Sequence, residues 1–252
     1  MKIRLTGMLL LLFMVMAGWS LSWAAGYQDL IKEGDSWYAQ RSDLSKAKMA
    51  AEVYRKAVAM DLNNAEGYWK LARALYWIGD ASPQDQQLAI FEEAINAAKK
   101  GVELNPNIAA THYWLGVNYG LYGQVKGVLK SLALVDPIKQ EANAVIKLDP
   151  FFEGGGGFLL IGRLYYKLPG LFGGDNDKSV EYLQQALKYG PQRWLTYVYL
   201  AETYMALKKN NEAKEVLEKA LAGPCEPDRI PECQKWKKDA ATVMAELKKK
   251  MQ

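Results

Sequence analysis

Four segments of the chain share one pattern, in which an aromatic residue precedes a Leu or Ile, a Gly or Ala follows, and a Tyr or Leu comes next. The segments are "AEGYWKLARALYWIGD", "AATHYWLGVNYG", "GGGFLLIGRLYY" and "WLTYVYLAETYMALKK". Their equivalent points are 44, 46 and 39 residues apart, at Leu71, Leu115, Ile161 and Leu200. At such a period, each unit is a small supersecondary structure that buries its apolar face against its neighbours. The chain is therefore expected to be a repeat array.

A second helical segment follows each of these, ending in "VELNP", "IKLDP", "LKYGP" and "LAGP". The unit resembles the tetratricopeptide repeat, a helix-turn-helix of about 34 residues. Ala201, Ala213 and Ala220 occupy packing positions at which antiparallel helices approach closely only when side chains are small. We predict an all-α, tetratricopeptide-like solenoid of about five helical hairpins over residues 25–222. Residues 223–252 are expected to form a linker and a C-terminal capping helix, because terminal repeats need a cover.

The N-terminal residues 1–24 have the pattern of a signal peptide. Lys2 and Arg4 precede the apolar run 8–17, and the stretch 22–24 offers small residues at the positions that a signal peptidase reads. We predict cleavage after residue 24 and export to the periplasm. The alternative is an uncleaved N-terminal membrane anchor that leaves the array facing the periplasm.

The charge of the exported part is nearly balanced. Without Lys2 and Arg4, 30 of the 32 basic residues remain, against 28 acidic ones. Binding to nucleic acid relies on a surplus of basic side chains that neutralise phosphates. We therefore expect no nucleic-acid partner.

The two cysteines, Cys225 and Cys233, lie close together in the stretch "GPCEPDRIPECQ". In an oxidising compartment such a pair is expected to form a disulfide. Closing so short a loop would stabilise the fold by roughly 2–3 kcal/mol in the chain-entropy model. The alternative is two free thiols.

Two glycine-rich stretches invite comparison with phosphate-binding loops. One is "KLPGLFGGDNDKS" (167–179) and the other is the run 154–157. A phosphate loop follows a strand and carries a Lys and a Ser or Thr at fixed offsets, whereas both of these lie at turns between helices. In the first, Pro169 is expected to end one helix, and Asp175 or Asp177 to cap the next. No nucleotide or other cofactor is expected.

Catalytic and metal-binding motifs are absent from the sequence. His112 is the only histidine, and it falls at a helix-packing position. One histidine and two cysteines do not make a zinc site, and no G-x-S-x-G occurs. We predict that the protein is not an enzyme; catalysis by carboxylates alone is the alternative.

The departures from a plain repeat form a pattern of their own. They are a long turn after Gly79, the extra segment 121–137, and the stretch "LDPFFEGGGGFLLIGRLYYKLPGLFGGDNDKSVEYLQQALKYGP". Over residues 65–221 they resemble the T component of TRAP transporters, the TatT family. The resemblance implies a periplasmic, homo-oligomeric accessory subunit of solute uptake that binds a TRAP solute-binding protein and a small organic acid. The alternative is a general periplasmic scaffold for protein–protein interaction in envelope assembly or secretion.

The repeat register also predicts which side chains face the concave side. In a tetratricopeptide unit these are the second, fifth, ninth and twelfth positions of the first helix, here Glu66, Trp69, Arg73, Tyr76, Tyr113, Val117, Leu159, Arg163 and Tyr166. Arg73 and Arg163 hold equivalent positions, and an arginine offers a planar fork of donors that matches a carboxylate. In the alternative, the two arginines pair with acidic groups such as Glu66 or Glu202. The concave side itself is either an open groove or a closed channel.

Overall fold

The computed structural model describes residues 25–252, and every regular element in this range is helical. The predicted signal peptide, residues 1–24, lies outside the described residues. Residues 25–39 form the first helix. The later helices are α2 (Leu44–Met60), α3 (Ala65–Ala81), α4 (Gln84–Leu104), α5 (Ala109–Lys126), α6 (Val135–Leu148), α7 (Gly156–Lys167), α8 (Asn176–Tyr189), α9 (Trp194–Ala206), α10 (Asn210–Ala222) and α11 (Ile230–Met251), with 3₁₀ helices η1 (Val128–Leu134), η2 (Gly170–Phe172) and η3 (Pro227–Arg229).

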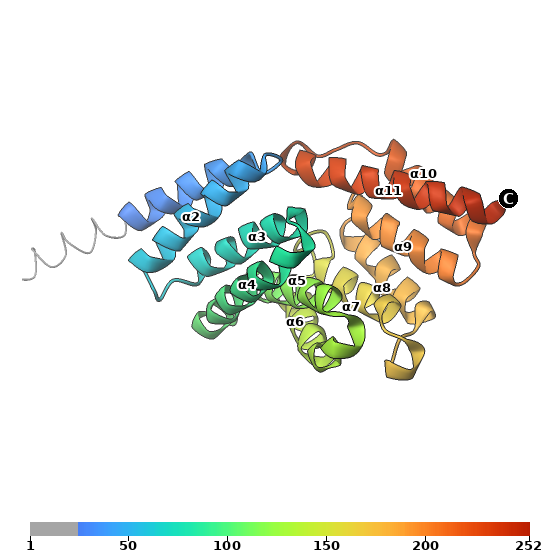
Figure 1. The fold of residues 1–252 in the computed structure, drawn as a ribbon, viewed down its shortest axis with the longest axis horizontal. Helices are drawn as coiled ribbons and strands as arrows, with labels where there is room; N and C mark the ends of the chain where they lie inside the picture. The colour runs from blue at the N-terminus through green and yellow to red at the C-terminus, as the bar shows by residue number, and fades with distance from the viewer. Residues whose placement is uncertain (1–24) are drawn as a thin grey trace, which may run out of the picture.

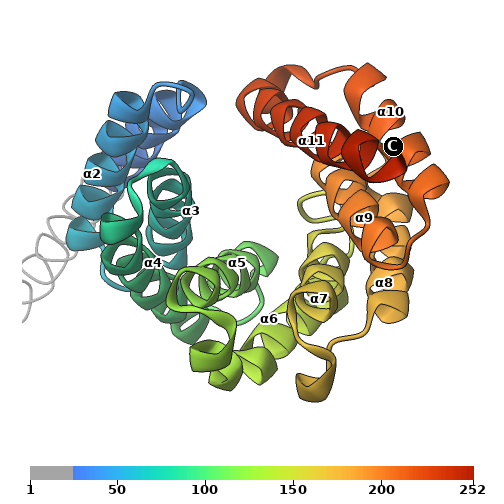
Figure 2. The ribbon, with the colours of Figure 1, turned by 45° about the vertical axis from the view of Figure 1, so that its right-hand side comes forward.

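Consecutive helices pair as antiparallel hairpins that stack into a curved array. Five hairpins run from the first helix with α2 to α9 with α10, and α11 covers the last of them (Figure 1). Viewed from another side, the array curls so that α11 approaches the first hairpin (Figure 2). The prediction of an all-α solenoid of five hairpins with a capping helix is confirmed.

Side chains at the hairpin turns define where several helices begin. Asp43 and Asn64 each accept a hydrogen bond from a backbone N–H in the first turn of α2 and α3. Asp175 does the same for α8, through the backbone N–H of Lys178. Of the two candidate caps of that helix, Asp175 is therefore the one that satisfies the free donors of its first turn.

Small side chains allow the helices of a hairpin to pack closely. Ala201 in α9 and Ala213 and Ala220 in α10 are all completely buried. Gly155 introduces α7 with a left-handed φ of 75°, and a Cβ there would lie 2.5 Å from the carbonyl oxygen of Ala186. Only glycine fits a position that requires both a positive φ and such close contact.

One sequence expectation about the turns was wrong. No long turn follows Gly79, because α3 continues to Ala81 and α4 begins at Gln84. A Cβ at Gly79 would lie 2.5 Å from the ring of Phe91, so this glycine makes room for α4 rather than ending α3. The extra segment 121–137 forms the end of α5, η1 and the start of α6.

The two ends of the array are bonded to each other. Arg41, in the turn after the first helix, donates two hydrogen bonds to the carboxylate of Glu232 in α11, one of them 2.6 Å long. It also donates to the backbone carbonyl of Asp228 in η3. We call the bond between Arg41 and Glu232 the end-to-end ion pair. It holds the capping helix against the first hairpin.

Candidate binding cavity on the concave face

The concave side of the array encloses a cavity of about 830 Å³. Its wall is built largely from the first helix of every hairpin together with α11, which packs on α9 and α10 at the end of the array. Six of the nine predicted residues line it, namely Arg73, Tyr76, Tyr113, Val117, Leu159 and Arg163.

The other three predicted residues lie outside the cavity. Glu66 and Trp69 belong to the first turns of α3 and line a separate hollow at the hairpin turns, beside Asn64 and Asn105. Tyr166, near the end of α7, lies under the cation of Arg163, 5.1 Å from the ring centre. Equivalent positions therefore differ between units, since Tyr76 lines the cavity and Tyr166 does not, and Tyr113 lines it and Trp69 does not.

Arg73 is held by groups of the first hairpin. Its Nη2 lies 3.3 Å from both Asp35 Oδ1 and the Tyr54 hydroxyl, and its guanidinium covers the Tyr38 ring at 4.0 Å. Burial alone would raise the pKa of Asp35, but hydrogen bonds from Lys70 and Tyr54 and the charges of Lys70 and Arg73 lower it below its ordinary value. Arg73 therefore pairs with Asp35 and not with Glu66.

Arg163 has an equivalent arrangement on the other side of the cavity. Its Nη1 bonds to the carboxylate of Glu202, and its guanidinium lies 3.8 Å from the centre of the Tyr199 ring. The guanidinium group of each predicted arginine is therefore already paired with a carboxylate of the protein.

Lys167, beside Arg163 in the wall, has no acidic partner among the described residues. Burial, and then the charge of Arg163, lowers its pKa.

A second ion-pair cluster in the wall was missed by the repeat pattern. Arg193 Nη2 donates to the Tyr113 hydroxyl at 2.7 Å, and its Nη1 bonds to the carbonyl and carboxylate of Glu153. Arg229 adds a 2.6 Å bond to the same carboxylate. Burial raises the pKa of Glu153, but the two arginines outweigh it and hold the pKa below its ordinary range. These residues lie in turns and in η3, to which the repeat pattern assigns no position.

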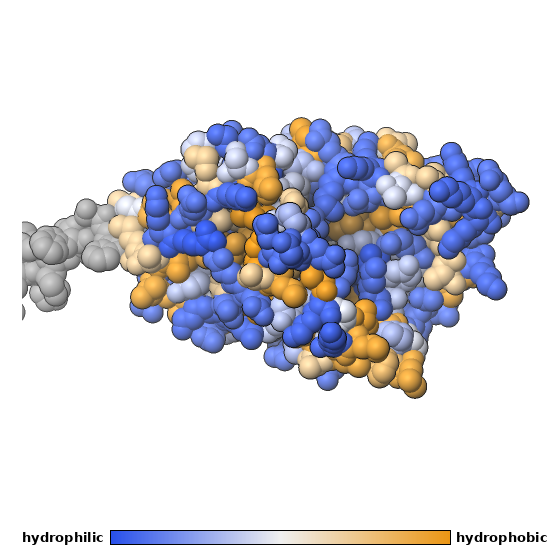
Figure 3. All heavy atoms as spheres, in the orientation of Figure 1, coloured by the Kyte–Doolittle hydropathy of each residue, from blue (hydrophilic) through white to orange (hydrophobic). Residues whose placement is uncertain are grey.

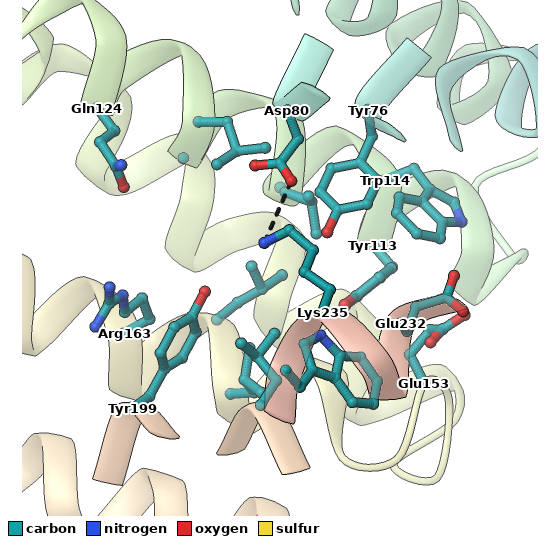
Figure 4. Close-up of a pocket in the computed structure, with 18 of the residues that line it drawn as sticks. Tyr76, Asp80, Tyr113, Trp114, Gln124, Glu153, Arg163, Tyr199, Glu232 and Lys235 are labelled. Carbon is teal, nitrogen blue, oxygen red and sulfur yellow. Dashed lines mark ion pairs between the residues drawn. The ribbon is translucent and has the colours of Figure 1, made fainter. Parts of the chain in front are cut away.

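The capping helix supplies further charges. Lys235 of α11 reaches across to Asp80 of α3, with Nζ 3.3 Å from the carboxylate oxygen (Figure 4).

In total the wall carries eight basic and eight acidic side chains. Because these balance, the cavity selects no ligand by net charge. Selection must come from local hydrogen-bonding groups.

Three buried N–H groups of the wall have no acceptor among the described residues. They are Nε of Arg73, Nε of Arg193 and Nε1 of Trp114, each on a residue that lines the cavity. Buried donors are almost always hydrogen-bonded in proteins, and an unpaired one costs about 1–3 kcal/mol. Each of these nitrogens has less than 1 Å² of exposed surface, so a molecule in the cavity does not reach them in this arrangement of the side chains.

Other kinds of site have little support in the described part of the chain. Residues 25–252 hold no group of three or more His, Cys, Asp and Glu side chains placed to bind a metal ion. No helix in this range combines the length and the apolar character needed to cross a bilayer. His112 lies away from the cavity, bonded to Glu141. Cys225, in the loop before η3, forms a disulfide with Cys233 of α11.

Comparison with known proteins matches two family models to this chain. The model described as "Regulator of microtubule dynamics protein 1-3" matches residues 30–171, more than half of the chain. A tetratricopeptide repeat model matches residues 173–223. Neither model is that of the TRAP T component, so that resemblance stays a prediction.

A curated relative carries the same name as the first model. The chain is 24% identical over 126 residues to regulator of microtubule dynamics protein 1 of Bos taurus. The match spans 49% of this chain and only 38% of the bovine protein. The rest of the bovine protein, with whatever it contributes to that protein's activity, lies outside the match.

Solved structures share the fold at low sequence identity. A thermophilic tetratricopeptide protein of Thermus thermophilus is 20% identical, with 87% of this chain and 99% of that chain covered and a TM-score of 0.63. PilF of Pseudomonas aeruginosa is 14% identical, with coverages of 90% and 93% and a TM-score of 0.57. At these identities the similarity establishes the tetratricopeptide-like fold alone.

Proposed function

This chain belongs to the regulator of microtubule dynamics protein 1-3 family, and on that premise we propose that it is a non-enzymatic helical-repeat binding protein whose concave cavity holds a small organic acid. The observation that carries the proposal is the amino group of Lys167, a basic residue of the cavity wall that has no acidic partner among the described residues. A carboxylate offers acceptor oxygens to such a donor, and bonds of this charged kind are the stronger ones.

The size and closure of the cavity support a small ligand. A volume of about 830 Å³ falls within the range of roughly 300–1,000 Å³ that is usual for small-molecule sites. The capping helix α11 packs on α9 and α10, and its first turns are bonded to Asp80 and Arg41, so the two ends of the curled array meet (Figure 2). An extended peptide needs an open groove, which this closure interrupts. The cavity therefore suits a compact molecule better than a peptide.

The proposed setting is the periplasm, with the protein as an accessory subunit of TRAP-type solute uptake that binds a solute-binding protein. Support comes from the signal-peptide pattern of residues 1–24 and from the resemblance to the T component. The alternative function is a scaffold for protein–protein interaction, for which the tetratricopeptide-like fold is the support. The bovine relative is named for the regulation of microtubule dynamics, so a filament-forming protein is a further candidate partner of such a scaffold.

A conservative substitution in the wall tests ligand binding. Lys167→Gln removes the unpaired cation and keeps a long polar side chain in the wall. Calorimetric titration of the wild type with mono- and dicarboxylic acids should identify a ligand, and Lys167→Gln should bind it about tenfold more weakly, the effect of losing one hydrogen bond to a charged group. Lys188→Gln is the matched control, because Lys188 is exposed and lies outside the cavity. A wild type that binds no carboxylate, or a Lys167→Gln variant with full affinity, would contradict the organic-acid proposal.

Co-purification distinguishes the role in solute uptake from the role as a scaffold. Recovery of a TRAP solute-binding protein with the tagged chain would favour solute uptake. Recovery of envelope-assembly, secretion or filament-forming proteins, with no solute-binding protein, would favour the scaffold.

A further inference from the structure

The glycine-rich loop "KLPGLFGGDNDKS" carries two large apolar side chains into solvent. Leu171, in η2, is 90% exposed, and Phe172 beside it is 41% exposed. Pro169 begins the turn, and Gly173 ends it with a left-handed φ of 87°. The loop therefore folds as a short, fixed projection with an apolar tip. Packing within the described chain does not explain a largely exposed Leu next to an exposed Phe.

A second apolar side chain lies at the same edge of the molecule. Leu129, in η1, is 64% exposed. η1 and η2 both project from the lower edge in two different views of the array (Figures 1 and 2). The space-filling view shows apolar surface gathered where η2 projects (Figure 3). We call Leu129, Leu171 and Phe172 the apolar edge.

Lysines flank the apolar edge in the sequence. Segments 126–139 and 168–178, which include η1 and η2, contain four lysines and three aspartates, the lysines being Lys126, Lys130, Lys139 and Lys178. Of these lysines only Lys178 forms an ion pair with a described residue, at 3.5 Å from Asp175. Lys139 and Lys178 both lie over the Tyr165 ring, at 5.2 and 5.6 Å, at the base of the projecting loop. The edge thus combines an apolar tip with unpaired positive charge.

We propose that the apolar edge docks on the surface of an anionic lipid bilayer. Leu171 and Phe172 enter the boundary between headgroups and acyl chains, Leu129 rests beside them, and the lysines contact the lipid phosphates. Apolar insertion together with attraction of lysines to anionic lipids is how peripheral proteins bind a bilayer without crossing it.

The shape of the edge favours a bilayer over a protein partner. The apolar side chains stand on tips from two separate segments, and neither the concave cavity nor the hollow beside Trp69 is lined by Leu129, Leu171 or Phe172. A bilayer accepts such tips wherever they meet it, whereas a protein would need pockets matched to each. The lysines near these tips match the negative surface potential of an anionic leaflet. This inference concerns a surface separate from the cavity and does not depend on its ligand.

A fluorescent label at the tip tests the proposal. Both native cysteines form the disulfide, so Leu171→Cys introduces one reactive thiol for an environment-sensitive fluorophore. Leu62→Cys is the matched control, because Leu62 is also largely exposed, at 60%, but lies in the turn between α2 and α3. With phosphatidylcholine vesicles that contain phosphatidylglycerol, the label at 171 should shift to the blue and be quenched by lipids brominated in the acyl chain. The label at 62 should change little.

Charge variants test the role of the lysines in the same assay. Lys130→Gln combined with Lys139→Gln should weaken binding to the anionic vesicles about tenfold or more, and phosphatidylcholine alone should give the same weakening for the wild type. Equal quenching at positions 62 and 171 would show that the chain meets the bilayer elsewhere. An unchanged label at 171 would overturn the proposal, and crosslinking of that position to a protein would assign the edge to a protein partner.

Discussion

Arg41 and Glu232 are 191 residues apart in the sequence and form a two-bond ion pair that joins the first hairpin to the last helix. Both side chains are largely buried, at 7% and 17% exposure. The pair encloses one side of the concave cavity.

Glu232→Ala should destabilise the protein by about 3–5 kcal/mol, because it leaves the buried Arg41 guanidinium without its partner. Urea unfolding followed by circular dichroism measures the change. Glu93→Ala is the control, since it breaks the exposed pair with Arg55 and should cost at most about 1 kcal/mol. Equal costs for the two variants would show that the end-to-end ion pair adds nothing beyond a surface contact.

Ala201→Leu should destabilise the array by about 1–3 kcal/mol, because the larger side chain forces α9 away from α10. Ala201 is completely buried, as are Ala213 and Ala220 on the facing helix. Ala206→Leu in the same helix is the control, because Ala206 is exposed. An Ala201→Leu variant with the melting temperature of the wild type would contradict the predicted packing register.

Reduction of the disulfide between Cys225 and Cys233 should loosen the start of α11 before the array unfolds. The loop that it closes carries Asp228 and η3, and Glu232 lies next to Cys233. Hydrogen exchange measured by mass spectrometry should become faster in residues 224–235 and in the turn around Arg41. Faster exchange confined to other hairpins would count against this view.

Stability should depend on pH through His112. Its Nδ1 lies 2.5 Å from a Glu141 carboxylate oxygen and its Nε2 lies 2.9 Å from the Pro106 carbonyl, so both ring nitrogens face acceptors and the protonated ring suits the site. The hydrogen bond with Glu141 outweighs burial and raises the pKa of His112 above its ordinary value of 6.5. The stabilisation of the folded state by protonated His112 is therefore fully present below pH 6.5, and it is lost as the pH rises through the raised pKa of His112.

Urea unfolding at a series of pH values checks this dependence. Wild-type stability should fall as the pH rises above 6.5, while Glu141→Gln, which removes the negative partner, should flatten that part of the profile. A wild-type profile that stays level above pH 6.5 would show that His112 is bound neutral.

The sequence predicted the repeats well because the pattern is local. Small residues such as Ala201 and aromatic residues at fixed offsets determine each hairpin, so a single chain is enough to recognise them. The same regularity led to the error at Gly79, where a packing glycine looked like a helix end.

The cavity was predicted only in part, for a different physical reason. Positions within a repeat indicated six wall residues, including Arg73 and Arg163, but not how the curvature of the array disposes them. The contributions of Arg193, Glu153 and Lys235 come from turns and from the capping helix. Which of these groups meet depends on the sum of small rotations between successive hairpins, and no single repeat encodes that sum.

The end-to-end ion pair also fixes how many repeats the array can contain. In an open tetratricopeptide array each unit contacts only its neighbours, so a unit can be gained or lost without effect on distant ones. Here, one more hairpin would separate Arg41 from Glu232 and Asp80 from Lys235. Duplication of a unit, in evolution or by engineering, would therefore break both contacts. Five hairpins is the number at which the two ends of this array can bond to each other.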